Sequence, residues 1–198
     1  MDLQLRGKKA LVTGGSHGIG QSIVFALADE GCDVAFCSRT NERLDETQKA
    51  LEKKTGINHL SIITDVLKPV EVERCFDLVE ELWGGVDILI NNVGGGGRWG
   101  NKDIVSTDRT VWADVYQKNA GATTNFTLRA IPMMKKKRWG RVITITSIYG
   151  VIGGGRPWFN MAKAAQTTFM KNMALNREFV RSGITFNSVA PGGIMIPE

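Results

Sequence analysis

The stretch from Thr13 to Gly20 constrains the fold of this chain more than any other. It reads TGGSHGIG and follows directly on the strand-like segment KALV at 9–12. A strand that ends in a glycine turn and leads into a helix points backbone N–H groups and the positive end of the helix dipole at one spot. Such a spot binds anions, including the pyrophosphate of a nucleotide. The stretch therefore predicts a nucleotide-binding α/β protein.

The glycine spacing and its context favour a dinucleotide. Gly14, Gly18 and Gly20 are spaced G-x-x-x-G-x-G, which differs from the general fingerprint G-x-G-x-x-G. They follow a predicted strand and open a predicted helix, which favours a dinucleotide site over a plain tight turn. No Gly-Lys-Ser/Thr follows, which argues against a P-loop NTPase. The residues expected at the diphosphate are Gly14, Ser16, His17, Gly18, Ile19 and Gly20.

Apolar runs alternate with helical patterns along the whole chain. The expected strands span 8–13, 33–38, 60–64, 86–91, 141–146 and 184–190, and the expected helices span 19–30, 41–55, 69–83, 108–136 and 159–182. Continuous apolar runs are typical of strands buried on both faces of a parallel sheet. This order predicts an α/β fold: a Rossmann-like, doubly wound parallel sheet in a three-layer αβα arrangement, forming one domain over residues 1–198.

Helix ends are also marked in the sequence. Asp108, preceded by Ser106 and Thr107, has the side chain of an N-cap for the fourth helix. Gly31, Gly56 and Gly183 stand where three of the helices are expected to stop.

The segment after the second expected strand indicates which dinucleotide binds. An acidic residue about 20 residues past the loop would hold the ribose hydroxyls of NAD, whereas an arginine accommodates the 2′-phosphate of NADP. The chain reads Ser38-Arg39-Thr40-Asn41 there and has no carboxylate. Arg39 could simply be an exposed loop residue, but its fork of donors suits phosphate. We therefore expect NADP(H) rather than NAD(H), with Ser38 and Arg39 at the phosphate.

Composition excludes several other classes of function. The 198 residues carry a net charge of +5, but most basic residues are scattered, so no nucleic-acid partner is expected. The densest run, Lys135–Arg138, suits the C-terminal end of a helix. Three cysteines without a CxxC spacing and two isolated histidines, His17 and His59, indicate neither a disulfide framework nor a metal site. Neither a signal segment nor an apolar run near 18 residues is visible, so we expect a cytoplasmic protein that does not cross a membrane.

Further motifs follow the glycine stretch in a fixed order. They are Asp65-Val66, Asn91-Asn92-Val93-Gly94, Asn119, Ser147, Lys163 and Pro191-Gly192. Together they resemble the short-chain dehydrogenase/reductase family, and in particular its 3-oxoacyl-[acyl-carrier-protein] reductase-like members. The resemblance implies an oxidoreductase that transfers a hydride between a nicotinamide and a ketone or secondary alcohol. The family's default substrate would be a β-ketoacyl thioester.

The resemblance also implies a role for each motif. Asp65 and Val66 would line the adenine pocket, while Asn91, Asn92 and Gly94 would support the sheet and pass near the cofactor. Asn119 would hold a water of a proton relay. Ser147 would hydrogen-bond the substrate carbonyl, and Lys163 would bind the nicotinamide ribose and lower the pKa of a catalytic tyrosine. Pro191 and Gly192 would close over the nicotinamide.

The catalytic tyrosine itself is missing. The family pattern is Tyr-x-x-x-Lys, but this chain reads Phe159-Asn160-Met161-Ala162-Lys163. Phenylalanine has no titratable proton, so the ordinary acid–base step is impaired. Three explanations remain open: a deliberate substitution in an otherwise active enzyme, made to trap a ligand; a natural homologue that has lost or rerouted catalysis and only binds NADP(H); or a misaligned helix. Tyr149 is the nearest other phenol in the sequence, and an aromatic wall of the pocket is its expected role.

Two glycine-rich segments, each followed by arginine and tryptophan, are candidates for the substrate pocket. They are 94–99 and 153–158, and with Ser147 and Tyr149 they suggest substrate contacts from Arg156 and Trp158. An anionic or aromatic substrate would explain them. The alternative is a pair of mobile surface loops whose tryptophans pack on the domain.

The last expectations concern the chain's end and its assembly. The chain ends six residues after Gly192, and Ile196 stands where the family's Pro-Gly-x-x-x-Thr pattern has threonine. The domain is therefore expected to be C-terminally incomplete, lacking a lid segment and a strand. The fourth and fifth helices carry apolar residues that belong either to the core or to an interface, and we expect a homodimer or homotetramer. The residues in question are Val111, Val115, Ala122, Phe126, Phe169, Met170 and Met173.

Overall fold

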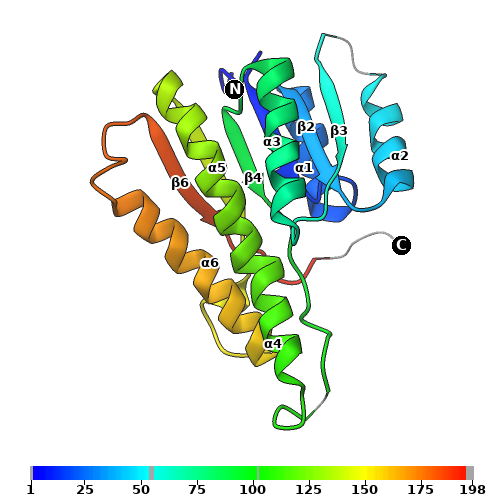
Figure 1. Ribbon diagram of the computed structural model, residues 1–198, viewed down its shortest axis with the longest axis vertical. Coiled ribbons are helices and arrows are strands. Elements are labelled where there is room, and N and C mark those ends of the chain that lie inside the picture. The colour runs from blue at the N-terminus through cyan, green and yellow to red at the C-terminus, as the bar shows by residue number, and fades with distance from the viewer. Residues whose placement is uncertain (1, 54–55, 102, 195–198) are drawn as a thin grey trace.

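The computed structural model describes residues 2–53, 56–101 and 103–194. Within them lies a six-stranded parallel sheet of order β3-β2-β1-β4-β5-β6 (Figure 1). The strands are β1 (Lys9–Thr13), β2 (Asp33–Ser38), β3 (His59–Ile63), β4 (Ile88–Asn91), β5 (Gly140–Ile145) and β6 (Ile184–Val189). The order reverses between β1 and β4, which creates a crevice at the carboxyl ends of these two strands. The predicted doubly wound fold is confirmed.

Helices cover both faces of the sheet. On one face α1 (Gly18–Asp29) and α2 (Asn41–Leu51) pack on β1 and β2, and on the other lie α3 (Pro69–Trp83), α5 (Ala122–Lys137) and α6 (Pro157–Leu175). Successive residues of a strand point to opposite faces. Accordingly Leu11 belongs to the core beneath α3 and α5, whereas Ala10 and Val12 belong to the core beneath α1. Both faces of the strands are therefore apolar, as their continuous hydrophobic runs predicted.

The helix expected over 108–136 is interrupted. It consists of α4 (Arg109–Tyr116), a π-helical turn η1 (Gln117–Gly121) and α5, which follow one another as a long rod extending beyond the sheet (Figure 1). Asp108 caps α4 as predicted, because its carboxylate accepts from Thr110 N at 2.8 Å. The wide turn contains Asn119, whose side-chain amide donates to the carbonyl of Val115 at 2.7 Å. Turns of this type are frequent at functional sites.

The last helix is shorter than predicted, and Gly183 does not end it. α6 ends at Leu175, and Asn176 leaves the helix with a ψ of 124°. The apolar pattern that suggested more helix is used differently: the Phe179 ring packs against Phe186 of β6 at 5.3 Å. Gly183 has a φ of +80°, and a Cβ there would lie 2.0 Å from the carbonyl oxygen of Arg138. Its small size lets the chain pass the end of α5 before β6.

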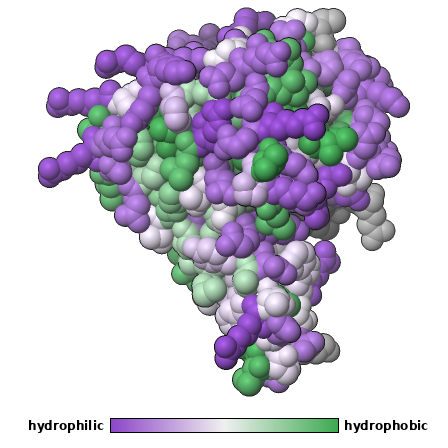
Figure 2. Space-filling model, viewed as in Figure 1, coloured by the Kyte–Doolittle hydropathy of each residue, from purple (hydrophilic) through white to green (hydrophobic). Residues whose placement is uncertain are grey.

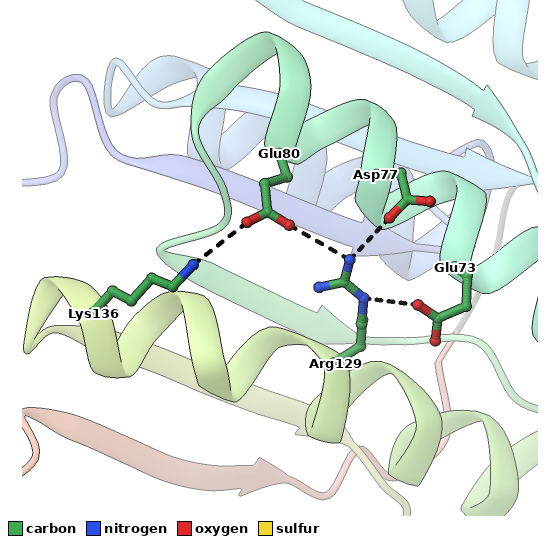
Figure 3. Close-up of polar contacts among 5 residues, drawn as sticks. All are labelled: Glu73, Asp77, Glu80, Arg129 and Lys136. Carbon is green, nitrogen blue, oxygen red and sulfur yellow. Dashed lines mark hydrogen bonds and ion pairs between the residues drawn. The ribbon is translucent and has the colours of Figure 1, made fainter.

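An ion-pair cluster joins α3 to α5 (Figure 3). Arg129 of α5 reaches three carboxylates of α3, with Nε to Glu73 at 2.8 Å and Nη2 to Asp77 at 2.9 Å and to Glu80 at 3.5 Å. Lys136, one of the clustered basic residues, lies 3.8 Å from Glu80. The cluster orients α5, and α5 continues directly from the turn that holds Asn119.

The other lysines of the basic run are paired as well. Lys137 lies 2.8 Å from Asp87, and Lys135 pairs with Glu178. Arg138 ends α5 in the left-handed conformation, with a φ of 51°. The run Lys135–Arg138 is thus the end of a helix, as its position in the sequence predicted.

Candidate active site

A cleft of about 300 Å³ opens beside the carboxyl ends of β1, β2 and β4, where the strand order reverses. Many residues predicted for the cofactor line it. They are Gly14, Ser16, His17, Ser38, Arg39, Asp65, Val66, Asn92 and Gly94. The segments after four different strands therefore meet at one place, as expected for a parallel sheet of this topology.

The glycine turn brings α1 against the end of β1. Gly14 has a φ of +64°, and a Cβ on Gly20 would lie only 2.1 Å from the carbonyl oxygen of Gly14. His17 occupies the N-cap position of α1, and no side chain of the described residues caps the helix there. The first-turn N–H groups and the helix dipole therefore suit an anion. Gly18, Ile19 and Gly20 form this first turn, so the residues that the sequence assigned to a diphosphate lie at the N-terminus of α1.

Side-chain hydrogen bonds join the ends of β1 and β4 at the point where the strand order reverses. The side-chain amide of Asn92 donates to the carbonyls of Thr13 and Gly14 at 3.0 and 3.1 Å. The hydroxyl of Thr13 in turn accepts from the backbone N–H groups of Asn92 and Val93 at 2.9 and 3.0 Å. Asn91 points the other way and donates to the hydroxyls of Thr127 and Thr144. Asn92 thus shapes the floor of the cleft, and Asn91 supports the sheet.

The cleft also contains residues that the sequence reasoning missed. They are Thr40, Arg43, Thr64, Leu67, Val93 and Lys118. Arg43 could have been found, because it lies in the first turn of a helix that starts just after Arg39. Lys118 directly precedes the predicted site residue Asn119, but only the π-helical turn shows which way it faces. The lining has three basic side chains, Arg39, Arg43 and Lys118, and one carboxylate, Asp65.

Asn119 and Lys163 meet behind Gly94. A Cβ on Gly94 would lie 2.6 Å from Asn119 Oδ1 and 2.9 Å from Lys163 Nζ, so only glycine leaves room for both groups. Asn119 forms a reciprocal pair with Gly95, accepting its N–H at 3.1 Å and donating to its carbonyl at 2.9 Å. Its own carbonyl accepts from the amide of Gln166 at 3.2 Å. The end of the cleft is therefore held by contacts from η1 and α6.

Lys163 is a buried ammonium with an unusual pKa. Its side chain extends from α6 to the carbonyl of Ile145, which accepts from Nζ at 3.0 Å, and the residue is only 4% exposed. Burial lowers the pKa of Lys163 to about 8. Strongly shifted groups in a cleft are candidates for function.

The turn that begins at Ser147 packs on the helix of this lysine and contacts Pro191. Ser147 follows β5, two residues after Ile145, and its hydroxyl accepts from Tyr149 N at 3.2 Å. The turn that Ser147 starts packs on α6, since a Cβ on Gly150 would lie 2.8 Å from the carbonyl of Lys163. The N–H of Ile148 donates to the carbonyl of Pro191 at 3.1 Å, which places Pro191 and Gly192 next to the same turn. Ser147, Asn119, Lys163, Pro191 and Gly192 do not line the cleft itself. Asn119 and Lys163 adjoin it through Gly94, and the Ser147 turn packs on the helix that carries Lys163.

Comparison with known proteins shows the family. The family described as short chain dehydrogenase matches residues 8–197. The chain belongs to the short-chain dehydrogenase family. Relatives include the 3-oxoacyl-[acyl-carrier-protein] reductases FabG of Aquifex aeolicus, 30% identical over 98% of this chain and 77% of the relative, and of Escherichia coli, 33% identical over 97% and 75%.

Solved structures show the same likeness. The L-sorbose reductase of Gluconobacter frateurii complexed with NADPH and L-sorbose has a TM-score of 0.92 and 32% identity over 100% of this chain and 73% of that chain. An actinorhodin polyketide ketoreductase with NADPH has a TM-score of 0.88 and 32% identity, covering 96% of this chain and 72% of that chain. The framework is that of an oxidoreductase of the short-chain dehydrogenase family.

Phe159 occupies a distinctive place in this short-chain dehydrogenase. It lies in the first turn of α6, one turn before Lys163, and Lys163 Nζ is 5.7 Å from the centre of its ring. On the other side, a Cβ on Gly97 would lie 3.5 Å from the ring. The aromatic ring therefore stands between the lysine and the glycine-rich segment after β4.

Of the predicted substrate residues, Trp158 cannot contact a ligand in this structure. It is 0% exposed, its indole N–H donates to the carbonyl of Gly96 at 3.1 Å, and its ring packs edge-on against Trp112 at 5.4 Å. Trp158 supports the glycine-rich segment from beneath, because the segment folds back over α6. In the structure the first glycine-rich segment continues over 94–101, and Arg156 joins it to the second by donating to the carbonyl of Asn101 at 2.8 Å.

Tyr149 has the position of a wall residue. Its ring is partly exposed and lies against Gly154 and Gly155, where Cβ atoms would come within 3.0 and 3.5 Å. It follows Ser147 by two residues, and its backbone N–H donates to the Ser147 hydroxyl. Tyr116, the other tyrosine, lies in α4 and is exposed away from this end of the cleft, beside Met161.

The remaining expectations concern the C-terminal residues, membrane spans, metal sites and the apolar faces of the helices. Ile196 lies outside the described residues. Among the residues described, no helix is long and apolar enough to cross a membrane, and no three His, Cys, Asp or Glu side chains gather where they could hold a metal ion. Of the apolar residues left open between core and interface, most are core: Val115, Ala122, Phe126, Met170 and Met173 are buried.

Proposed function

We propose that this chain binds NADP(H) and has the apparatus for hydride transfer between the nicotinamide and a ketone or secondary alcohol, impaired because Phe159 stands in place of a tyrosine. The observation that supports it most is that Asn119 and Lys163 meet behind Gly94, which lines a basic cleft, while Lys163 also reaches the end of β5, two residues before Ser147. NADPH is present in the L-sorbose reductase and polyketide ketoreductase structures that resemble this chain.

The choice of NADP(H) over NAD(H) rests on the charges of the cleft. Ser38 and Arg39 follow β2, where an acidic residue would select the free ribose hydroxyls. The carboxylate of the cleft, Asp65, follows β3 instead. Arg39 is exposed and lines the cleft, so its guanidinium can pair with a 2′-phosphate in a bidentate manner. The N-terminus of α1 would hold the diphosphate.

The catalytic end supplies donors to a carbonyl oxygen. The chemistry that the nicotinamide supplies is hydride transfer to or from the carbonyl carbon. Negative charge that develops on the oxygen is stabilised by the Ser147 hydroxyl, which is a preorganised donor next to the site. The ammonium of Lys163 would hold the nicotinamide ribose and keep the local potential positive. Asn119, in the π-helical turn, would hold a water for proton supply.

Phe159 leaves this arrangement without its proton donor. A hydroxyl on the ring of residue 159 would be near the Lys163 ammonium, and a positive charge lowers the pKa of a phenol. Loss of a positioned acid or base costs about 10²–10⁴-fold in rate. The chain as it stands is therefore expected to bind its cofactor well and to turn over slowly.

The test is Phe159→Tyr, assayed by oxidation of NADPH with a panel of ketones that includes ketoses and β-ketoacyl thioesters. We expect the rate to rise by about 10²–10⁴-fold with an unchanged Kd for NADPH. Phe169→Tyr is the matched control, because it makes the same chemical change later in α6, where the ring packs against the core. It is expected to leave the rate as it is.

A Phe159→Tyr variant that binds NADPH and stays inert would favour the second candidate, a non-catalytic NADP(H)-binding protein. Phe159 itself is the observation that favours this candidate. A chain that binds neither NADPH nor NADH in calorimetry would contradict both.

Assembly as a homodimer or homotetramer is part of the proposal. Apolar side chains are exposed along the rod of α4 and α5 and on α6, and green patches interrupt the polar surface over this region (Figure 2). They include Tyr116, Leu128, Met161 and Leu175. Apolar faces of this kind favour association. We place the protein in the cytoplasm, where its buried free cysteines Cys32, Cys37 and Cys75 stay reduced.

A further inference from the structure

Lys118 lines the cofactor cleft without a role in the function described so far. It belongs to the π-helical turn η1, one residue before Asn119. Its ammonium lies 3.9 Å from the position that a Cβ on Gly95 would take, which places it at the wall formed by the segment after β4. Partial burial and the nearby charge of Arg39 lower its pKa, while Asp65 opposes this effect.

The ammonium of Lys118 rests on an aromatic ring. Its Nζ lies 4.6 Å from the centre of the Trp99 ring, a cation–π contact. Among the described residues, no carboxylate forms an ion pair with Lys118 or Arg39, and Asp65 acts on Lys118 only at a longer distance. Trp99 is 42% exposed and lies in the glycine-rich segment 94–101, which also contacts Phe159. Lys118 therefore touches both the cofactor cleft and the segment over the catalytic end.

Three basic side chains against one carboxylate leave the cleft with an excess of positive charge. Like charges in a partly desolvated cleft repel each other, and an anion that enters relieves the repulsion. The diphosphate has its own site at the N-terminus of α1. Lys118 lines the same cleft as Arg39 and Asp65, which follow β2 and β3 and belong to the part of the cleft assigned to the adenosine.

We propose that Lys118 recognises the same 2′-phosphate as Arg39 and that this phosphate competes with the Trp99 ring for the ammonium of Lys118. The inference rests on the proposed binding of NADP(H) and adds a specificity-determining residue to it. A charge-assisted bond to phosphate is stronger than a cation–π contact at a half-exposed ring. Occupancy of the phosphate subsite thereby loosens Trp99 and changes the packing of the segment 94–101 over the catalytic end.

The test uses 2′,5′-ADP and 5′-ADP as probes, since they differ only by the 2′-phosphate. Their Kd values are measured by calorimetry for the unmodified chain, Lys118→Met and Lys118→Arg. Lys118→Met is expected to weaken 2′,5′-ADP about tenfold and 5′-ADP by less than about threefold, and Lys118→Arg to stay within about threefold for both. Lys49→Met removes an exposed charge from α2, outside the cleft lining, and is expected to change neither Kd.

Equal weakening of both probes by Lys118→Met, or none, overturns the inference. Failure of the unmodified chain to bind NADPH at all would instead contradict the proposed function, so the two failures are distinguishable. Thermal unfolding of each variant checks that the fold is retained.

Fluorescence reports on the second half of the inference. Titration with 2′,5′-ADP, which does not absorb at the excitation wavelength, is expected to change the tryptophan emission of the unmodified chain in a saturable way. The change is expected to be absent in Trp99→Phe and to be reduced in Lys118→Met. An emission change that persists unaltered in Trp99→Phe shows that Trp99 does not respond and overturns the coupling.

Discussion

Replacing Lys163 with methionine is expected to stabilise the nucleotide-free protein at neutral pH. Lys163 is 4% exposed and its pKa is lowered to about 8 from 10.5 by burial. Each pH unit of such a difference is worth about 1.4 kcal/mol, so the charged lysine costs about 3 kcal/mol of stability at pH 7. Methionine fills similar space without the charge. The variant also leaves the carbonyl of Ile145 without the Lys163 donor, which reduces the expected gain in stability by about 1 kcal/mol.

The pH dependence separates the charge from these packing effects. Because the folded-state pKa lies below the unfolded value, the unfolded chain binds more protons between pH 8 and 10.5. The free energy of unfolding therefore rises with pH through this window and is flat with respect to Lys163 below it. In Lys163→Met this rise is absent, while every other titrating group contributes equally to both proteins.

The measurement is urea unfolding of both proteins from pH 6.5 to 10.5. The difference in free energy of unfolding between the variant and the unmodified chain is expected to be greatest below pH 8 and to shrink by about 3 kcal/mol toward pH 10.5. A difference that stays constant with pH would refute the reasoning, because it would show that Lys163 titrates alike in the folded and unfolded chains. A lysine kept at such a cost is expected where function requires it.

Three further predictions follow from single contacts. Gly20→Ala places a Cβ 2.1 Å from the carbonyl oxygen of Gly14 and is expected to abolish NADPH binding in calorimetry. Gly153→Ala is the control, because no atom lies within 4 Å of its added Cβ, and it is expected to leave NADPH binding unchanged. Equal Kd values for NADPH in the two variants would contradict this prediction. Arg129→Met is expected to lower the free energy of unfolding by about 1 kcal/mol at low salt and by less at 1 M salt, because its carboxylate partners are largely exposed. A loss of stability that does not depend on salt would exclude the ion pairs as its cause. Asp108→Ala removes an N-cap and is expected to cost about 1 kcal/mol in urea unfolding, with Asp108→Asn close to neutral; equal losses in both would show that the cap is not responsible.

The prediction of the fold succeeded where the information is local. The strand expected at 33–38 is β2 with the same bounds, because a continuous apolar run between Gly31 and a polar turn is compatible with little else. The helix expected at 69–83 is α3, which begins at a proline and ends before Gly84 in the left-handed conformation. Proline at the first turn and glycine after the last are signals that act within the helix itself.

The prediction failed where distant segments decide the outcome. Phe179 continues the apolar periodicity of α6, but it packs on β6 from a non-helical segment. Trp158 follows a glycine-rich loop, a position that suggested a ligand contact, yet the loop 94–101 folds over it and buries it completely. Hydrophobic periodicity does not say which other segment covers a side chain, so neither result was visible in the sequence.

The candidate site divides in the same way. The sequence by itself determined the strand–turn–helix unit at 13–20, the parallel order of elements and the chemical types present, including Phe159 one helical turn before Lys163, since these depend on residues near one another in the chain. Only the tertiary structure decided that Lys118 and Arg43 face the cleft and that burial desolvates the Lys163 ammonium. The same holds for the space that Gly94 leaves for Asn119 and Lys163. Burial, and the electrostatics that follow from it, arise when segments far apart in the chain come to exclude water from the same space.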